Sequence, residues 1–351
     1  MAVTADTDYW VGIDAGHTEC AICLIDRAGT VLLEAVRDSN AGAVTDILRV
    51  FGVERVQAIT IEAGVGMHIV RKLLDRDLPV KVVDPRKSSK FLSIRRQKTD
   101  PCDARGLAEL GRLGASIGAG IHINRPDQDD IRIQLNVRRS ILNCRIRTDA
   151  AIRSILHRHG ASMRVGNSPG KLRFEVTQVL RERMRHGYAV RADLMRLVAV
   201  GEVLRSQLAH LDREVSSLAE SIDVCANLQT MPGVGPLTAL SFYSAIGDPH
   251  RFTRNTDVGP YLGLAPTLRQ SGATALRGRV GRFGNKMVRG HLIIGATLIL
   301  TQCKADSRLR SWGLDLMSRT NFIKARVAVA RKMSVVLLQM WKSGAPFDAK
   351  L

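Results

Sequence analysis

Acidic residues are scarce in this chain of 351 residues, which has 33 Asp and Glu against 52 Lys and Arg and a formal net charge of +19. Such an excess argues against an ordinary metabolic enzyme and favours a polyanionic partner. Cysteine is also sparse. The six cysteines are scattered, and the Cys20-x-x-Cys23 pair has no second pair that would complete a zinc site. We therefore interpret them as buried thiols.

Long hydrophobic runs are missing as well. No segment reaches the roughly 18 apolar residues that a membrane helix needs, and the first residues lack the basic-then-apolar order of a signal peptide. We expect no membrane partner and a cytoplasmic bacterial protein that joins the nucleoid when it acts. Because 45% of the residues are hydrophobic, the composition also excludes intrinsic disorder.

The positive charge is unevenly distributed. Residues 1–80 hold seven basic and twelve acidic residues, whereas residues 269–332 hold fourteen basic residues and two acids. Codon bias towards arginine would not separate the charge in this way. Nucleic acid is the expected partner, because neutralising its phosphates releases condensed counterions. The basic residues that we expect to bind it are Arg86, Lys87, Arg95, Arg96, Lys98, Arg269, Arg277, Arg279, Arg282, Lys286 and Arg289.

The first third of the chain predicts a mixed α/β sheet. Three apolar runs separated by turns predict an antiparallel meander, and two later strands follow helical stretches, which is typical of parallel crossovers. This order matches a ribonuclease H-like architecture. The expected strands are 9–14, 20–26, 30–36, 56–62 and 80–83, with helices near 43–51 and 67–76.

The rest of the chain predicts helices. Apolar residues recur every three or four positions from Leu194 to Cys225, with Gly201 as a weak member. This seam predicts either a coiled coil between subunits or a helical hairpin within one chain. The glycine-rich segment 231–239 is either a phosphate-approaching hairpin or a plain turn between helices. We divide the chain into an α/β domain (1–125), a helical coiled-coil region (126–226) and a mainly helical C-terminal domain (227–351).

Four carboxylates occupy unusual positions. Asp14 and Glu62 end apolar strands, where an unpaired charge is costly to bury. Asp100 and Asp103 lie three residues apart at the start of a predicted helix, on one side of it. Mg²⁺ or Mn²⁺, which prefers oxygen ligands, would explain all four.

Two alternatives remain for these acids. Asp100 before Pro101 suits a helix N-cap, and Asp103 would then favour the helix dipole. Asp14 in the segment Asp14-Ala15-Gly16-His17-Thr18 also suits the phosphate turn of actin-like sugar kinases. That reading needs a second such turn, and the sequence has none.

Several motifs, taken in sequence order, give the chain a likeness to a known family. The first are Gly12-Ile13-Asp14, Ile61-Glu62-Ala63 and the segment 98–104 (KTDPCDA), and others follow towards the C-terminus. It resembles the insertion-sequence-110 family of DEDD transposases over nearly its whole length. The C-terminal motifs are 232–236 (PGVGP), 246–252 (IGDPHRF), 261–264 (YLGL), 270–272 (QSG) and 284–286 (GNK).

The resemblance implies that residues 1–125 form a RuvC-like nuclease domain with a metal-binding tetrad of Asp14, Glu62, Asp100 and Asp103. It further implies a C-terminal nucleophile at Ser271 that forms a covalent link to DNA. It also implies a structured guide RNA that pairs with donor and target DNA, and homodimers or homotetramers in which one subunit's serine meets another's nuclease domain. The sequence agrees in one respect. Because no acid occurs between residues 262 and 304, any carboxylate that activates Ser271 must come from elsewhere.

The function predicted from the sequence is therefore metal-dependent DNA strand cleavage and exchange by a transposase or recombinase. Two alternatives stay open. One is a junction-resolving nuclease that uses metal-activated water and is indifferent to Ser271. The other is a nucleic-acid scaffold with a decayed site, whose binding would ignore magnesium.

Overall fold

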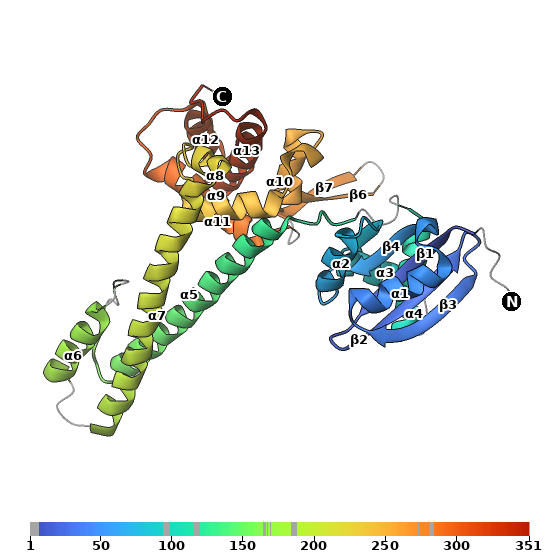
Figure 1. Cartoon of the computed structure of the whole chain (residues 1–351). Coiled ribbons are helices and arrows are strands. Elements are labelled where there is room, and N and C mark those ends of the chain that lie inside the picture. Colours follow the sequence, from blue (N-terminus) through green and yellow to red (C-terminus); the bar gives the residue numbers. More distant parts are fainter. Residues whose placement is uncertain are drawn as a thin grey trace. The chain divides into compact units, whose positions relative to one another are not determined.

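The computed structural model describes residues 7–93, 99–114, 120–163, 166, 168, 170–183, 188–271, 274–280 and 284–350, without the side chains of 87, 183, 188–190, 267–271 and 274–280. The chain forms two compact units, Met1–Ile123 and Asn124–Leu351 (Figure 1). Among the helices described, none is long and apolar enough to cross a membrane.

The first unit is built on a five-stranded mixed sheet. Its strand order is β3-β2-β1-β4-β5, in which β1, β2 and β3 are antiparallel neighbours and β1, β4 and β5 run parallel. This topology confirms the mixed sheet predicted from the order of strands and helices. The strands are β1 (Tyr9–Ala15), β2 (Glu19–Asp26), β3 (Val31–Asp38), β4 (Val56–Glu62) and β5 (Val80–Val83).

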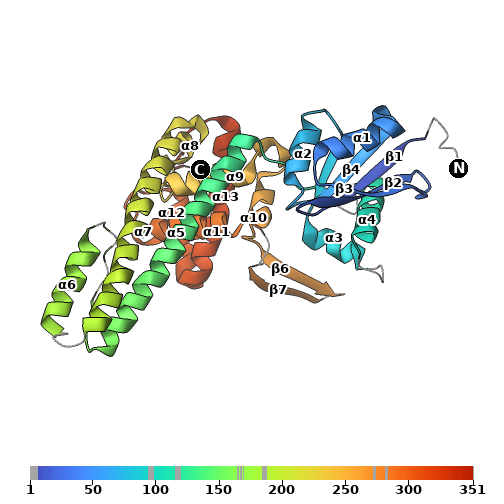
Figure 2. The ribbon, with the colours of Figure 1, turned by 60° about the horizontal axis from the view of Figure 1, so that its bottom comes forward.

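Helices cover both faces of this sheet (Figure 2). Alternate strand residues, such as Ile13 and Ile61, pack in a core with α1 (Ala41–Phe51) and α2 (Met67–Leu74). The opposite face carries α3 (Pro85–Leu92) and α4 (Asp100–Arg112). A short 3-10 helix, Val53–Arg55, precedes β4.

Small residues let α4 lie directly on β1. A Cβ on Gly12 would stand 1.9 Å from the carbonyl oxygen of Ala104 and 2.3 Å from the amide nitrogen of Ala108. Only glycine fits between the strand and the helix backbone at this point. The contact fixes where α4 begins relative to the end of β1.

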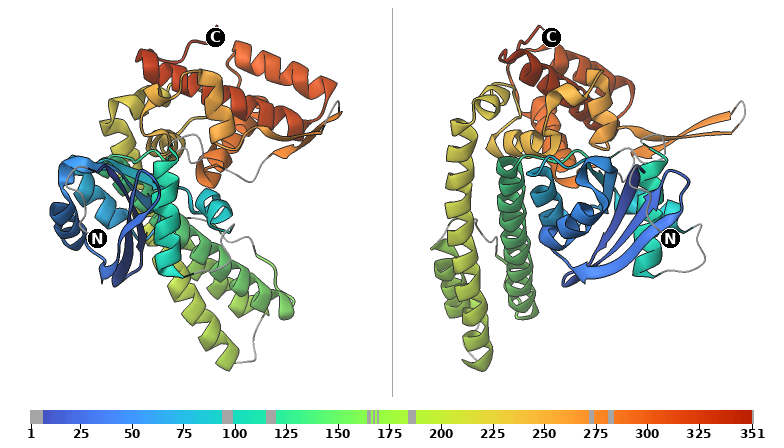
Figure 3. Two further views of the ribbon diagram at one scale, coloured as in Figure 1. Left: turned by 90° about the vertical axis from the view of Figure 1, so that its right-hand side faces the viewer. Right: turned by 45° about the vertical axis from the view of Figure 1, so that its right-hand side comes forward.

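In the second unit, α5 (Pro126–Arg158) and α7 (Tyr188–Ser221) form a long hairpin, in which they lie side by side (Figures 1 and 3). The shorter helix α6 (Lys171–Arg183) packs against α7, and their apolar residues form a small core with the distal end of α5.

The predicted seam packs within the chain. Leu194, Leu208 and Val215 are buried in the cores that α7 shares with α5 and its neighbours. Gly201 lets α6 come close, since a Cβ there would lie 2.7 Å from the end of the Leu172 side chain, which would have to shift. Of the two alternatives for the seam, the structure shows the helical hairpin. The subunit-to-subunit coiled coil stays a prediction.

The C-terminal helices share one large core with the bases of α5 and α7, since Ile131 and Val215 contribute to it. Residues 126–226 and 227–351 therefore belong to the same compact unit. Helix α9 lies at the centre, and its residues 238–246 are all buried. The helices are α8 (Asp223–Leu228), α9 (Pro236–Ile246), α10 (Val258–Tyr261), α11 (Lys286–Thr301), α12 (Arg308–Arg319) and α13 (Phe322–Ser343), with 3-10 turns at Pro249–Arg251 and Asn255–Asp257.

The glycine-rich segment before α9 serves helix packing. Gly233 has φ of 79°, and a Cβ there would stand 2.5 Å from the carbonyl oxygen of Gly295 in α11. This close approach explains the glycine without any phosphate. It favours the interhelical turn over the phosphate-approaching hairpin.

Two strands that were not predicted follow α10. Strands β6 (Pro266–Ser271) and β7 (Thr274–Val280) form an antiparallel hairpin that projects from the helices of its unit (Figure 3).

The interpretation of the cysteines as buried thiols is wrong in part. Cys20, Cys23 and Cys225 are buried, but Cys144 is exposed.

Candidate functional site

Asp14 and Glu62 lie at the ends of neighbouring parallel strands. Ile13 of β1 is paired with Ile61 of β4, so the two acids that follow are also neighbours. Because side chains alternate along a strand and both isoleucines face α1 and α2, Asp14 and Glu62 point to the α4 side of the sheet. Both are partly buried.

Helix α4 begins above this edge of the sheet. Asp100 and Asp103 occupy its first turn, directly before Ala104, whose carbonyl group contacts Gly12. Asp103 is partly buried and Asp100 is exposed. The fold therefore brings the start of α4 to the strand that carries Asp14.

The capping interpretation of Asp100 is not supported. The N-cap residue is Thr99, with extended backbone, and Asp100 is the first helical residue. No side-chain hydrogen bond caps this helix. Asp100 and Asp103 still interact favourably with the positive end of the helix dipole. They therefore stabilise the helix whatever other role they have.

A buried serine, which the sequence analysis did not identify, orients Glu62. The Ser88 hydroxyl in α3 donates a hydrogen bond to Glu62 Oε1 at 2.5 Å, and Ser88 is only 1% exposed. Asp84, at the end of β5, caps α3 by accepting from the Arg86 amide at 2.9 Å. Nothing in the local pattern marks Ser88, because its role depends on how α3 packs against the sheet.

The donor chemistry of the four acids suits a hard divalent cation, because carboxylate oxygens are the ligands that Mg²⁺ and Mn²⁺ prefer. Their arrangement is less complete. Within the described residues, no three Asp, Glu, His or Cys side chains lie close enough together to hold one ion. The structure thus brings Asp14 and Glu62 to neighbouring strand ends and packs α4 on the same face of the sheet. The described residues do not form a complete set of metal ligands.

The other predicted site residues are distributed over both units. Ser271 is the last residue of β6, where its backbone pairs with Thr274, and its side chain lies outside the described part. Arg86 is exposed on α3, while Lys286 and Arg289 lie in the first turn of α11. Residues Arg95, Arg96, Lys98 and Arg282 lie outside the described ranges, as do the side chains of Lys87, Arg269, Arg277 and Arg279.

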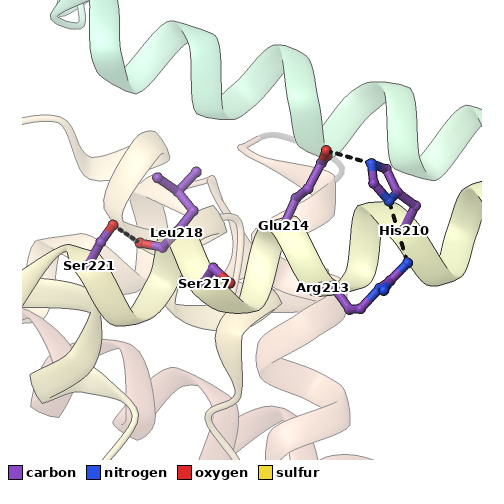
Figure 4. Close-up of a pocket in the computed structure, with 6 residues that line it drawn as sticks. All are labelled: His210, Arg213, Glu214, Ser217, Leu218 and Ser221. Carbon is purple, nitrogen blue, oxygen red and sulfur yellow. Dashed lines mark hydrogen bonds and ion pairs between the residues drawn. The ribbon is translucent and has the colours of Figure 1, made fainter.

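A shallow hollow of about 570 Å³ on the outside of α7 contains none of these predicted residues (Figure 4). His210 Nε2 lies 3.1 Å from Glu214 Oε1, and His210 Nδ1 lies 3.5 Å from a guanidinium nitrogen of Arg213. All three residues belong to α7. These are exposed neighbours one turn apart, which contribute little to stability. The hollow offers no arrangement typical of a catalytic site.

Comparisons with known proteins agree with one another. Residues 225–311 match the transposase IS116/IS110/IS902 family, and residues 11–160 match the model of DEDD transposases of the IS110 type. The chain is 26% identical to the transposase for insertion sequence element IS1111A of Coxiella burnetii over 332 residues, covering 93% of this chain and 88% of that protein. It is 24% identical to the IS1328 transposase of Yersinia enterocolitica, covering 83% and 85%.

Among solved structures, the chain is similar to Thermus thermophilus RuvC, both in complex with a Holliday junction substrate and as a separate RuvC structure. Each likeness has 13% sequence identity and covers 32% of this chain. The complex gives a TM-score of 0.26 over 99% of the RuvC chain, and the second structure gives 0.25 over 98%.

Proposed function

Because this chain belongs to the IS116/IS110/IS902 family of transposases, we propose that it moves an insertion sequence by metal-dependent cleavage and exchange of DNA strands through a covalent link to Ser271. One observation of the structure carries the metal-dependent part. Asp14 and Glu62 lie at the ends of adjacent parallel strands, and Asp100 and Asp103 occupy the first turn of α4, which packs on the same sheet.

In this proposal the four acids hold divalent cations. Bound Mg²⁺ or Mn²⁺ would stabilise the charge that develops on the attacking and leaving oxygens of a phosphodiester. Ser88 contributes by fixing one oxygen of Glu62 through its hydrogen bond. Gly12 contributes by allowing α4 to approach the sheet.

Ser271 would act as the nucleophile. Its Oγ forms a bond to phosphorus, the bond from phosphorus to one strand oxygen breaks, and the serine proton leaves with a base while the departing oxygen gains a proton. Attack by a hydroxyl of a second strand then reverses these steps and frees the serine. The arginine-rich surroundings support this role, because guanidinium groups bind phosphate oxygens in pairs.

We also propose that donor and target DNA are the substrates, that a structured RNA guides them, and that the protein works as a homodimer or homotetramer. Ser271 lies in one compact unit and the four acids in the other. A chain organised in this way is compatible with pairing between one subunit's serine and another subunit's acids.

The test is strand exchange in vitro with a matched set of variants. Asp14→Asn and Glu62→Gln should each reduce exchange at least about a hundredfold, whereas Asp46→Asn, an exposed acid of the same unit, should not. Ser271→Ala should bind DNA but give no protein–DNA adduct on a denaturing gel. Full exchange by either acid variant would refute the tetrad.

The same set distinguishes the alternatives. Cleavage that survives Ser271→Ala but needs the acids would identify a nuclease that uses water. DNA binding that ignores magnesium, with no cleavage by the wild type, would identify a scaffold.

A further inference from the structure

A basic groove lies between three helices of the second unit. Of the predicted site residues, its lining contains Lys286 alone. It is a cavity of about 250 Å³, and its lining comes from one face of α5, from α9 and from the first residues of α11. We define the basic groove by Arg132, Asn136, Arg139, Ser241, Ser244 and Lys286.

The charge of the groove is not balanced by its own lining, which contains no Asp or Glu. Arg132 is paired with Asp129 at 3.3 Å, on an exposed part of α5. Within the described residues, neither Arg139 nor Lys286 forms a salt bridge. The positive end of the α11 dipole adds to this charge, because Asn285 and Lys286 also line the cavity. An anion in the groove would relieve the repulsion.

The floor of the groove is polar, but its two serine hydroxyls are bonded within the protein. Ser241 and Ser244 are 2% and 1% exposed. The Ser241 hydroxyl lies 2.9 Å from Nδ1 of His291 and 3.1 Å from the Thr238 carbonyl oxygen. The Ser244 hydroxyl donates to the Ser241 carbonyl oxygen at 3.4 Å. Both hydroxyls are therefore occupied within the protein, and the cations of the rim, Arg139 and Lys286, are the groups available to a phosphate.

The length of the groove points to a polymer rather than a single phosphate. A second hollow of about 260 Å³ shares Arg139 and Lys286 with the first and continues to Asn143 and His291. Along α5, Arg132 and Arg139 are seven residues apart, which corresponds to about 10 Å. Cations at such a spacing can contact successive phosphates of one strand.

We propose that the basic groove binds the sugar-phosphate backbone of a nucleic acid, with Arg139 and Lys286 as the principal phosphate contacts. This inference rests on the proposed function for the kind of substrate, but it assigns contacts on α5 and α11 that include neither the tetrad residues nor Ser271. The shared chemistry is the phosphodiester, which DNA and RNA both supply.

His291 offers a spectroscopic signal of occupancy. Burial, together with the Arg138 and Arg139 guanidinium groups, lowers the pKa of His291, so its ring is neutral at pH 7. The other charged groups around it are Lys286 of α11 and Asp212 of α7, which pairs with Arg138 at 2.5 Å. A bound phosphate would offset the arginine charges and raise the pKa of His291.

The test measures binding of a labelled 30-base-pair DNA duplex and of a labelled RNA hairpin in EDTA, where no metal-dependent chemistry runs. Arg139→Gln should weaken binding of at least one probe about fivefold or more, and the slope of log K against log salt should fall by about one. The matched control is Arg147→Gln, an exposed residue of α5 outside the groove, which should change binding less than twofold.

A loss with only one probe identifies DNA or RNA as the occupant. Equal binding by Arg139→Gln and Arg147→Gln with both probes would overturn the proposal. So would an unchanged His291 pKa, measured by NMR of the histidine-labelled full chain with saturating DNA and with saturating RNA, assigned with His291→Gln. These results are independent of the tetrad, because binding is measured in EDTA, where no divalent metal is held by its acids.

Discussion

At the scale of single residues, the absence of a side chain at Gly12 determines where two catalytic candidates lie. The backbone of α4 occupies the space that a Cβ would need. Asp100 and Asp103 belong to the turn that this contact positions, so a residue with no chemistry of its own controls the geometry of the acids.

We predict that Gly12→Ala destabilises the first unit by about 3 kcal/mol or more, because the clash is with backbone atoms that cannot rotate away. Hydrogen exchange of peptides from β1 and α4 measures the loss. Gly120→Ala is the control, since its Cβ would meet only the Val82 carbonyl oxygen at an ordinary 3.5 Å. Similar exchange rates in the two variants would contradict this account of the packing.

His291 predicts a pH dependence of stability. Its folded-state pKa lies below the unfolded value of 6.5, so the unfolded chain binds the proton more tightly. The stabilisation from the neutral ring is therefore present above pH 6.5 and is lost as the pH falls through the folded pKa. Between pH 7.5 and about 5, the wild type should lose more free energy of unfolding than His291→Gln. Parallel curves from urea titrations would show that the ring is not held neutral.

At the scale of elements, the α5–α7 hairpin depends on a buried ion pair. Arg205 of α7 has a fully buried side chain and donates to Asp149 of α5 at 2.8 Å. The same guanidinium donates to the carbonyl oxygens of Gly166 and Gly201, each at 3.0 Å. The pair fixes the register of the two helices.

Removing Arg205 should leave the buried Asp149 with only the more distant Arg145, whose Nε lies 3.9 Å from Asp149 Oδ2, so we predict that Arg205→Met costs about 3–5 kcal/mol. The measurement is the free energy of unfolding of the hairpin, followed by hydrogen exchange over residues 194–215. Arg196→Met is the matched control on the same helix, because Arg196 is exposed and its ion pair with Asp193 should contribute less than about 1 kcal/mol. Equal stability of both variants would refute the role of the pair.

The same helix shows where sequence patterns stop being informative. The predicted seam located the amphipathic face of α7. Val198 and Arg205 are fully buried, however, while Leu197 and Leu204, which continue the three-and-four spacing from Leu194, are only partly buried. An arginine at a core position is not predictable, because its burial depends on Asp149 some 56 residues away.

At the scale of the whole molecule, the sheet was the most predictable part. Its strands are short apolar runs bounded by turns or helices, and their order alone gives the observed topology. The proximity of Asp14 and Glu62 follows from this, because each ends a neighbouring strand. The β6–β7 hairpin was not expected, because the glycine- and arginine-rich stretch lacks alternating apolar residues. Ser88 was missed because a buried hydroxyl leaves no periodic signal.

The central claim is that Asp14, Glu62, Asp100 and Asp103 together bind divalent metal. Titration of Mn²⁺ into the protein–DNA complex, followed by electron paramagnetic resonance, tests it most directly. Asp14→Asn and Asp100→Asn should each weaken Mn²⁺ binding at least about tenfold, while Asp46→Asn, which removes the same charge from an exposed position of the same unit, should bind like the wild type. Wild-type affinity in both tetrad variants would contradict the account.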